Sequence, residues 1–436
     1  MKNERNKIAK AVVWGLIGSF LCGTVAGCAK TQTPDDSGKT KKLSAQYQKE
    51  TQAADGEVSE EFCAAYADFS FNLLREGRKS RNEAVKNTFV SPLSVMTALE
   101  MAGFGADGET EKQIDAVLYE GLSGEEGRKN LVAFADGLTN EEDASFIEAN
   151  SIWLRTGKEA VKPKEDFLEK NGVDFGADIF SAPFDEETVE DINDWVNEKT
   201  EGNIKEILNQ IPEEAQMYLI NASSFDAKWQ EIYRETDITE DEVFTCVDGS
   251  EKTVAMMNSE ENRYLYGEKE TGFRKPYAEG YSFVALLPEE GITIDDYVNQ
   301  LDGETFLKLL KEEEDAKVIT HLPEFKADTA LELSDVLSSL GMPLAFDKEK
   351  AEFPGIFEDS AEKVWINRVL HKTHIEVDAQ GTKAGAVTAV EIAALSAAPG
   401  QEQPKEVYLN RPFVYAIVDD DTNLPIFIGV AEDIGK

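Results

Sequence analysis

The sequence predicts an α+β fold with largely antiparallel or mixed sheets. Helical patterns occur mainly early in the chain, whereas strand patterns dominate after residue 217. The two kinds of element do not alternate, as they would in a fold built from βαβ units around a parallel sheet. Hydrophobic residues make up 41% of the 436 residues, so the chain can bury a sizeable core.

The individual elements follow from the spacing of apolar residues and from residues that start or stop helices. Apolar side chains at intervals of three and four predict a first helix over residues 58–75. Pro92, placed directly after Ser91, suits the first position of a second helix. The predicted helices are residues 58–75, 93–102, 189–199 and 331–340. The predicted strands are residues 88–90, 146–154, 217–225, 242–245, 253–257, 263–266, 281–287, 371–377, 407–418 and 426–430, of which 413–418 and 426–430 form a hairpin.

The N-terminal segment is typical of a protein exported by a bacterium. A positively charged start precedes an apolar stretch, residues 11–25, that is too short to cross a membrane comfortably. Its end, Val25-Ala-Gly-Cys28, resembles a lipobox, which predicts cleavage after residue 27 and a lipid on Cys28 that anchors the protein outside the cell membrane. The alternative is an ordinary secretory signal that is cut nearby. Residues 28–56 carry few large apolar side chains and are predicted to be a disordered tether, followed by one domain over residues 57–436.

The charge balance excludes some classes of partner. The chain carries 44 Lys and Arg against 85 Asp and Glu, a net charge of −41. Such a surface repels the phosphate backbone of nucleic acids and offers no basic patch to anionic lipids. We interpret it as a soluble, self-repelling surface.

The sequence contains no common catalytic motif. Gly103–Gly108 has the spacing GxGxxG, but it follows a helix, whereas the dinucleotide fingerprint follows a strand. The chain has three His and no G-x-S-x-G, H-E-x-x-H, C-x-x-C or Walker sequence. His371 and His374 are three apart on a predicted strand and therefore lie on opposite faces, which does not suit a shared metal. We expect no enzyme activity, no catalytic residue, no metal and no cofactor.

Residues 378–406 form a long loop between two predicted strands, and loops of this length are usually functional or disordered. Its alternate residues form one small, uncharged set: Thr382, Ala384, Ala386, Thr388, Val390 and Ile392. The charges of this stretch, Lys383 and Glu391, both belong to the other set. Because strand side chains alternate between faces, the loop could enter a sheet without burying a charge. The alternative is a surface loop whose alternation is accidental.

Several motifs together resemble the serpin family. Residues 381–386 (GTKAGA) resemble the hinge of inhibitory serpins, and residues 409–417 (LNRPFVYAI) resemble the C-terminal signature of the family. Further matches are residues 87–94 (NTFVSPLS), 191–200 (DINDWVNEKT) and 221–229 (NASSFDAKW). They occur in the order typical of the family and cover roughly residues 57–435.

The resemblance implies a fold with helices around a large central sheet, smaller sheets and an exposed reactive loop. It also implies a suicide-substrate inhibitor of serine, and possibly cysteine, endopeptidases. The protease would cut the loop and form an acyl-enzyme, and the loop would then insert into the main sheet and trap the covalent complex. We expect a monomer whose partner is the target protease.

The resemblance also assigns positions in this chain. The hinge is Gly381, Thr382, Ala384, Ala386 and Thr388. Fourteen residues after Gly381, the scissile bond is predicted between Leu395 and Ser396, with Ala394 or Ala397 as alternative registers. A Leu before the cut suits a chymotrypsin-like protease, and the small residues before it also suit elastase-type enzymes.

Two structural regions are assigned in the same way. Ser91, Ser94, Asn221 and His371 match the shutter, a hydrogen-bonded cluster under the centre of the main sheet. Trp229 matches the breach, where the loop would first enter. These roles are mechanical rather than catalytic.

Two residues depart from the family pattern. Ala379 and Lys383 both stand where inhibitory members commonly have Glu. Neither belongs to the uncharged alternating set, so inhibition remains the preferred interpretation. The alternative is a non-inhibitory serpin that acts as a surface binding or chaperone-like protein. A more distant alternative, a lipid-anchored solute-binding protein, would need two α/β lobes that the pattern does not indicate.

Overall fold

The computed structural model describes residues 39–47, 58–81, 86–155, 162–200, 202, 204–358, 364–382 and 404–435. The described residues all belong to one unit, Ser37–Lys436. Several predicted positions lie outside them: Cys28, Ala384, Ala386, Thr388, Leu395 and Ser396. None of the described helices is long and apolar enough to cross a membrane.

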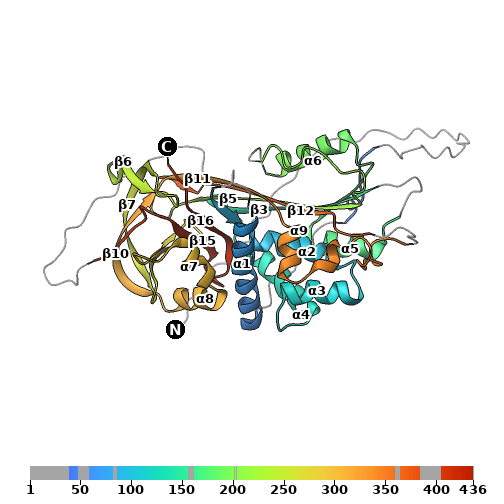
Figure 1. Cartoon of the computed structure of the whole chain (residues 1–436), viewed down its shortest axis with the longest axis horizontal. Helices are drawn as coiled ribbons and strands as arrows, with labels where there is room; N and C mark the ends of the chain where they lie inside the picture. Colours follow the sequence, from blue (N-terminus) through green and yellow to red (C-terminus); the bar gives the residue numbers. More distant parts are fainter. Residues whose placement is uncertain are drawn as a thin grey trace, which may run out of the picture. The chain divides into compact units, whose positions relative to one another are not determined.

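A main sheet runs across the view in Figure 1. Its strand order is β1 (Lys41–Lys42), β4 (Asp178–Ala182), β3 (Ala144–Arg155), β5 (Met217–Lys228), β13 (Gly381–Thr382), β12 (Arg368–Val377) and β11 (Phe325–Glu332). The sheet is mixed, because β3 pairs parallel with β4 and β5 pairs parallel with β12, whereas the other described pairings are antiparallel. Its two longest strands, β3 and β5, pair over eleven positions from Ala144 to Leu154.

A second sheet is built from strands of the C-terminal half and β2. Its order is β14 (Lys405–Tyr408), β10 (Glu314–Pro323), β7 (Glu251–Tyr266), β8 (Glu270–Pro276), β9 (Tyr281–Pro288), β15 (Phe413–Asp419), β16 (Pro425–Ala431) and β2 (Thr88–Val90), with β6 (Ile238–Thr245) paired to β7. Strand β9 is buried along its whole length and continues the apolar pattern of residues 281–287. The combination of these sheets with separate helices confirms the predicted α+β class.

Seven of the nine described helices begin at a Ser, Thr or Asp whose side chain caps them. The described helices are α1 (Glu60–Ser80), α2 (Pro92–Gly103), α3 (Gly108–Leu118), α4 (Gly124–Gly137), α5 (Glu165–Phe175), α6 (Glu186–Lys199), α7 (Ile294–Gln300), α8 (Gly303–Lys311) and α9 (Ser334–Leu340). The Ser59 side chain accepts from the amide of Phe62 and caps α1. Pro92 stands at the first position of α2 after Ser91, as predicted. The glycine-rich segment after α2 leads into α3, so it is a connection between helices and not a nucleotide loop.

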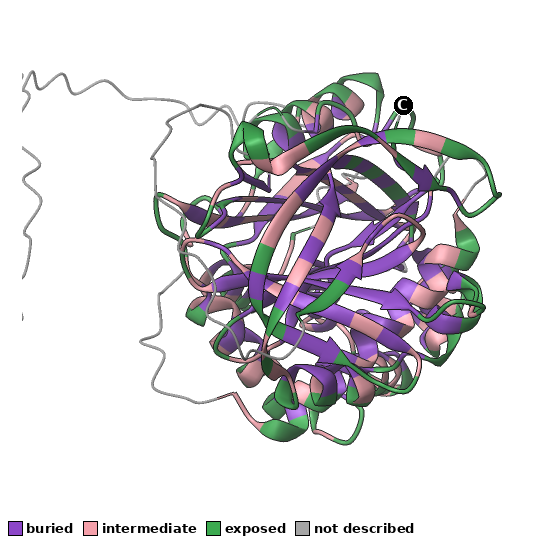
Figure 2. Cartoon of the chain, turned by 90° about the vertical axis from the view of Figure 1, so that its left-hand side faces the viewer, coloured by how far each residue is buried: buried purple, intermediate pink, exposed green. Residues whose placement is uncertain are grey.

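Helices cover both faces of the main sheet (Figure 1). Helix α6 lies on one face, where Ile192 and Val196 pack with Tyr218 of β5 in a small apolar cluster. Helix α2 lies on the other face within the large core that also includes the second sheet. Figure 2 shows this interior in purple beneath an exposed outer layer. The shutter positions therefore lie between the main sheet and α2.

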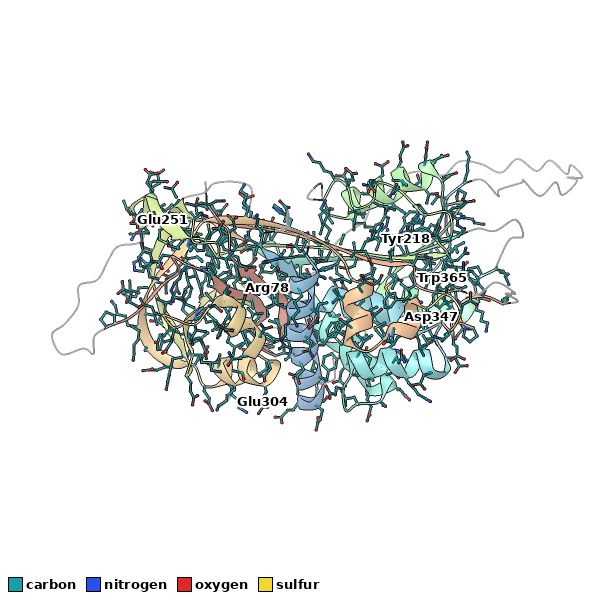
Figure 3. The ribbon with its side chains drawn as sticks, viewed as in Figure 1. Arg78, Tyr218, Glu251, Glu304, Asp347 and Trp365 are labelled. Atoms are coloured by element: carbon teal, nitrogen blue, oxygen red, sulfur yellow. The ribbon has the colours of Figure 1, made fainter. Side chains whose placement is uncertain are left out.

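Ion pairs between buried Glu432 and two arginines connect the segment after β16 to α1. Arg78, labelled on α1 in Figure 3, donates to Glu432 at 2.6 Å, and Arg81 pairs with the same carboxylate. Glu432 is fully buried. The amides of Glu432 and Asp433 both donate to the side-chain oxygen of Asn87, at 2.8 and 2.9 Å. This network closes the second sheet against the first helix.

The predicted disordered tether is wrong for residues 39–47. Strand β1 pairs with β4 at the edge of the main sheet, and the buried Ser44 accepts a hydrogen bond from the amide of Ile179 at 3.0 Å. Lys42 forms an ion pair with Asp178. Edge pairing and one buried hydroxyl are enough to dock a polar segment, and neither leaves an apolar periodicity in the sequence.

Three predicted element boundaries also need correction. The strands predicted over residues 253–257 and 263–266 are one continuous strand, β7. The sequence predicts one helix over residues 331–340, but Leu331 and Glu332 end strand β11 and the helix begins at Ser334. The predicted strand over residues 407–418 is divided into β14 and β15, and Pro412 lies between them. Proline has no amide hydrogen to donate to a ladder, which explains the break.

Candidate functional site

Strands β5 and β12 separate at one end of the main sheet, and the chain after β12 enters the space between them. The two strands pair over six positions, from Tyr218↔Arg368 to Ser223↔Thr373. Beyond these, Thr382 of β13 is placed opposite Ala227 on one side and opposite Val377 on the other. Strand β13 is antiparallel to both neighbours. The first two hinge residues therefore already form the start of a central strand.

The side chain of Thr382 is enclosed at this position. It is 1% exposed, and its hydroxyl lies 2.5 Å from the hydroxyl of Tyr277. Burial raises the pKa of Tyr277, so the phenol stays neutral and can share a proton with the threonine. The ring of Tyr277 is stacked on Trp229, with 4.5 Å between the ring centroids. Thr382 is thus buried and bonded to a tyrosine whose ring is itself held by stacking on Trp229.

Gly381 has a steric reason to be glycine. A Cβ atom at this position would lie 2.0 Å from the carbonyl oxygen of Ala227 and 2.8 Å from the Cα of Lys228. Both atoms belong to the backbone of β5, so they cannot rotate away. Only a residue without a side chain lets the chain approach β5 closely enough to begin a strand.

The backbone just before the hinge, residues 378–380, is hydrogen-bonded to Trp229 of the breach and to Tyr233. The amide of Trp229 donates to Gln380 O at 2.9 Å, and its indole Nε1 donates to Asp378 O at 2.8 Å. The amide of Tyr233 donates to Ala379 O at 2.9 Å. Trp229, predicted from its motif, therefore lies at the entrance to the space between β5 and β12. Ala379 contributes a partly buried methyl group against the core.

The shutter residues lie together under the sheet. His371 on β12 stands opposite Asn221 on β5, and its Nδ1 is 2.8 Å from Asn221 Oδ1. The amide of Ser91 donates to His371 Nε2 at 3.1 Å, and the Asn221 side chain donates to Ser94 O at 3.0 Å. Because Nε2 accepts, the proton of the neutral ring is on Nδ1 and is donated to Asn221. The structure brings all four predicted positions into one network.

Burial controls the charge of this network. His371 is 1% exposed, and desolvation lowers its pKa from 6.5 to about 3. Charging the ring would also give Nε2 a proton that points at the amide of Ser91, which is itself a donor. His371 is therefore neutral at ordinary pH. It holds β5 and β12 together as a hydrogen-bonding group and not as a base.

Sequence reasoning missed several residues of the site. Asn150 on β3 accepts from the Asn221 side chain at 2.6 Å and extends the shutter to a third strand. Tyr277, Tyr233 and the buried Lys275 form the wall behind the breach. Lys275 lies at the end of β8 and Tyr277 directly follows this strand, Tyr233 lies in the loop after β5, and Asn150 lies in β3. No spacing along the chain signals that these segments meet. Among the described residues, no group of three or more His, Cys, Asp or Glu side chains could hold a metal ion.

Comparison with known proteins gives a consistent result. The profile of the serpin (serine protease inhibitor) family matches residues 64–434. An uncharacterised serpin-like protein of Thermococcus kodakarensis is 30% identical, with 84% of each chain covered. The leukocyte elastase inhibitor of Xenopus tropicalis is 28% identical, over 85% of this chain and 98% of that protein.

Solved structures agree with these relatives. The crystal structure of the thermophilic serpin tengpin in the native state is 41% identical, covers 91% of this chain and 100% of its own, and gives a TM-score of 0.83. The latent state of tengpin covers 87% of this chain and 99% of its own at 42% identity, and gives a lower TM-score of 0.75. The matched profile, the relatives and the shared fold together show that this chain belongs to the serpin family.

Proposed function

We propose that this protein is an inhibitory serpin, a suicide-substrate inhibitor of serine endopeptidases with chymotrypsin-like or elastase-like preference. The protease attacks the carbonyl between Leu395 and Ser396, and its serine replaces the Ser396 amine to give an acyl-enzyme. The freed loop then inserts into the main sheet and carries the protease with it. The members of this family are mostly protease inhibitors rather than enzymes.

The observation that carries this proposal is the position of β13. If its register continues, each further pair of residues moves two positions down β5 and β12. Ala384 then stands opposite Phe225 and Ile375, and Thr388 opposite Asn221 and His371. The insertion path therefore runs from the breach to the shutter.

The side chains along this path fit the loop. Phe225, Ser223 and Asn221 are at most 3% exposed and point to one buried side of the sheet. Directly opposed residues of antiparallel strands share a face. The inward residues of the loop would therefore be Thr382, Ala384, Ala386 and Thr388, which carry no charge and are small enough for a covered face. Lys383 would point to the opposite side.

The test is a gel-based assay for a covalent complex. Purified protein is incubated with chymotrypsin and, separately, with pancreatic elastase, and the products are boiled in SDS. We expect a band at the summed mass and loss of protease activity with at least one of them. Mass spectrometry of the small C-terminal fragment locates the cut. Complete cleavage near Leu395 with active protease released would favour the alternative, a non-inhibitory surface protein.

We also propose that Cys28 carries a lipid that anchors the protein to the outer side of a bacterial membrane. The support is the sequence Val25-Ala-Gly-Cys28 after a charged start and an apolar stretch. Fractionation of cells that express the wild type and Cys28→Ser tests this. The wild type should be found with membranes and carry added lipid mass, and Cys28→Ser should not. Wild-type protein that is soluble in the medium and free of lipid would contradict the anchor.

A further inference from the structure

A buried lysine lies directly behind the residues that hold the hinge. Lys275 on β8 is 1% exposed. Its Nζ is 2.7 Å from Glu261 Oε1 and donates to Glu231 O at 3.3 Å. The same nitrogen lies 4.5 Å from the ring centroid of Tyr233 and 5.4 Å from that of Trp229. The ammonium group is therefore enclosed by one carboxylate, one carbonyl and two aromatic faces.

Packing alone does not require a lysine here. A buried charge is costly unless it is paired, and an apolar side chain of similar length would fill the same space. Burial disfavours the charge, but Tyr233 and Glu261 outweigh it and raise the pKa of Lys275 above its ordinary value. The group thus remains a cation, and its attraction to the two ring faces is of the kind that fixes aromatic side chains in place.

The pair is itself held from behind. Ser259 Oγ donates to Glu261 Oε1 at 2.7 Å, and it lies 3.3 Å from the hydroxyl of Tyr233 and 2.8 Å from Thr320 Oγ1. The carboxylate that positions Lys275 is therefore fixed by side chains of β7 and β10. The ammonium end of the Lys275 side chain is therefore held in one position.

The two aromatic residues that face Lys275 are the ones that bind the chain before the hinge. Trp229 donates its amide to Gln380 O, and Tyr233 donates its amide to Ala379 O, both at 2.9 Å. A displacement of either ring would move the backbone that carries these amides. In the described part of the chain, the Lys275 ammonium contacts Glu261, the carbonyl of Glu231 and the rings of Tyr233 and Trp229. The route from Lys275 to the segment before the hinge therefore runs through Trp229 and Tyr233.

We propose that Lys275 is a positioning residue for loop insertion. By fixing the rings of Trp229 and Tyr233, it holds Ala379 and Gln380 at the entrance between β5 and β12 and so speeds entry of the cleaved loop. This inference rests on the proposed inhibitory function. Loss of the lysine slows insertion while the protease still cuts and hydrolyses at its own rate, and more molecules are released as cleaved substrate.

The variants separate positioning from charge balance. Lys275→Met removes the cation and leaves Glu261 buried without its partner, so it destabilises the fold as well. The double variant Lys275→Met/Glu261→Gln removes both charges and is expected to unfold near the wild-type midpoint. Arg274→Met is the matched control, because Arg274 pairs with Asp420 and Asn423, each at 2.8 Å, and not with the breach.

Two quantities are measured for each variant. The first is the number of inhibitor molecules consumed per protease inactivated, which should rise several-fold in both Lys275 variants and stay at the wild-type value in Arg274→Met. The second is hydrogen exchange of the segment 228–234, which contains the two amides that bind the chain before the hinge. Exchange there should be faster in both Lys275 variants only.

The results that overturn the proposal are distinct from those that overturn inhibition. The proposal is overturned if the double variant consumes as many inhibitor molecules per protease inactivated as the wild type and its residues 228–234 exchange hydrogen at the wild-type rate. It is also overturned if the double variant does not fold. In both cases the pair of Lys275 and Glu261 serves stability alone. The exchange measurement needs no protease. If the wild type forms no covalent complex, the proposed function fails, while faster exchange in the Lys275 variants still supports the positioning of the breach.

Discussion

The neutral ring of His371 carries a stability cost in acid. Its folded-state pKa is about 3, whereas the ordinary value is 6.5. Between these values the unfolded chain binds a proton that the folded chain does not, so stability falls as the pH is lowered from 6.5 toward 3. Above pH 6.5 the full contribution of the shutter hydrogen bonds is present.

We expect this cost to appear as a pH-dependent difference between the wild type and His371→Gln. Glutamine keeps polar atoms but does not titrate. Each pH unit below 6.5 contributes up to about 1.4 kcal/mol, so the advantage of the wild type should shrink by about 2–3 kcal/mol between pH 7 and pH 4.5. Urea unfolding of both proteins at the two pH values measures it. A difference that is constant with pH would contradict a depressed pKa.

Thr382 offers the sharpest single-residue test of the insertion mechanism. Its side chain is 1% exposed and bonded to Tyr277, so Arg at this position would place a charge beside a buried phenol and a stacked indole. An unpaired buried charge costs several kcal/mol. The Thr382→Arg variant should therefore be cut at or beside Leu395 but should release active protease, and its consumption per protease inactivated should rise well above the wild-type value.

The control for Thr382→Arg is its neighbour in the sequence. Lys383 belongs to the other alternating set, so Lys383→Arg should inhibit as the wild type does. The two variants add the same chemical group one residue apart. If Thr382→Arg keeps the wild-type consumption, loop insertion does not compete with hydrolysis in this protein and the assignment of the hinge fails.

At the level of elements, the N-terminal segment 39–47 is a docked edge of the main sheet. Ser44 is 2% exposed, and its hydroxyl is the partner of the amide of Ile179. Removing the acceptor leaves a buried amide unsatisfied, which costs about 1–3 kcal/mol. Ser44→Ala should therefore lower the unfolding free energy by that amount, and the exposed Gln46→Ala should leave it unchanged. Equal effects of the two substitutions would mean that the segment is not docked in solution.

Local patterns predicted four of the nine described helices and ten of the sixteen described strands. The strand over residues 88–90 has the predicted bounds, and the helix at Pro92 begins where its cap indicates. Local patterns failed where a boundary is set by pairing with a distant partner. Leu331 has the spacing of a helix but pairs with His371 across the main sheet, so it ends a strand. A ladder of hydrogen bonds outweighs a weak local preference.

The site was predictable only where a motif marked it. Trp229, Asn221 and His371 are assigned by resemblance. In the structure Asn221 and His371 are hydrogen-bonded to each other and Trp229 binds the chain before the hinge, while their breach and shutter roles stay predictions. Tyr277 and Lys275 could not be found in this way, because their importance comes from strands far apart in the chain that meet at the breach. A lysine in a strand predicts an exposed side chain, and only the tertiary environment shows that this one is buried.

At the level of the whole molecule, the main sheet could accept one more complete strand between β5 and β12 if these two strands separate along their length. Strands β5 and β12 are parallel neighbours, and β13 is antiparallel to both of them. Full insertion would therefore replace one parallel pairing by two antiparallel pairings, which are slightly more stable per residue. We expect that this gain is not realised while the loop is intact, because both ends of the loop are held in strands, at β13 and at β14. On this view the uncut protein is kinetically trapped.

Cutting the loop should release this trapped stability. A protease that is not a target, used briefly to nick the segment between Thr382 and Lys405, produces cleaved protein without an acyl complex. Insertion adds roughly a dozen ladder residues at about 1 kcal/mol net each, on the order of 10 kcal/mol. For a domain of this size that corresponds to a rise of roughly 10 °C or more in the unfolding midpoint.

The measurement is thermal unfolding of intact and nicked protein under identical conditions, with Thr382→Arg nicked in parallel. The nicked variant should gain less, because an arginine at position 382 has to stay buried if the strand is to extend beyond β13. An unchanged midpoint in the nicked wild type would mean that the sheet does not expand, and the protein would then belong with the non-inhibitory members of its family.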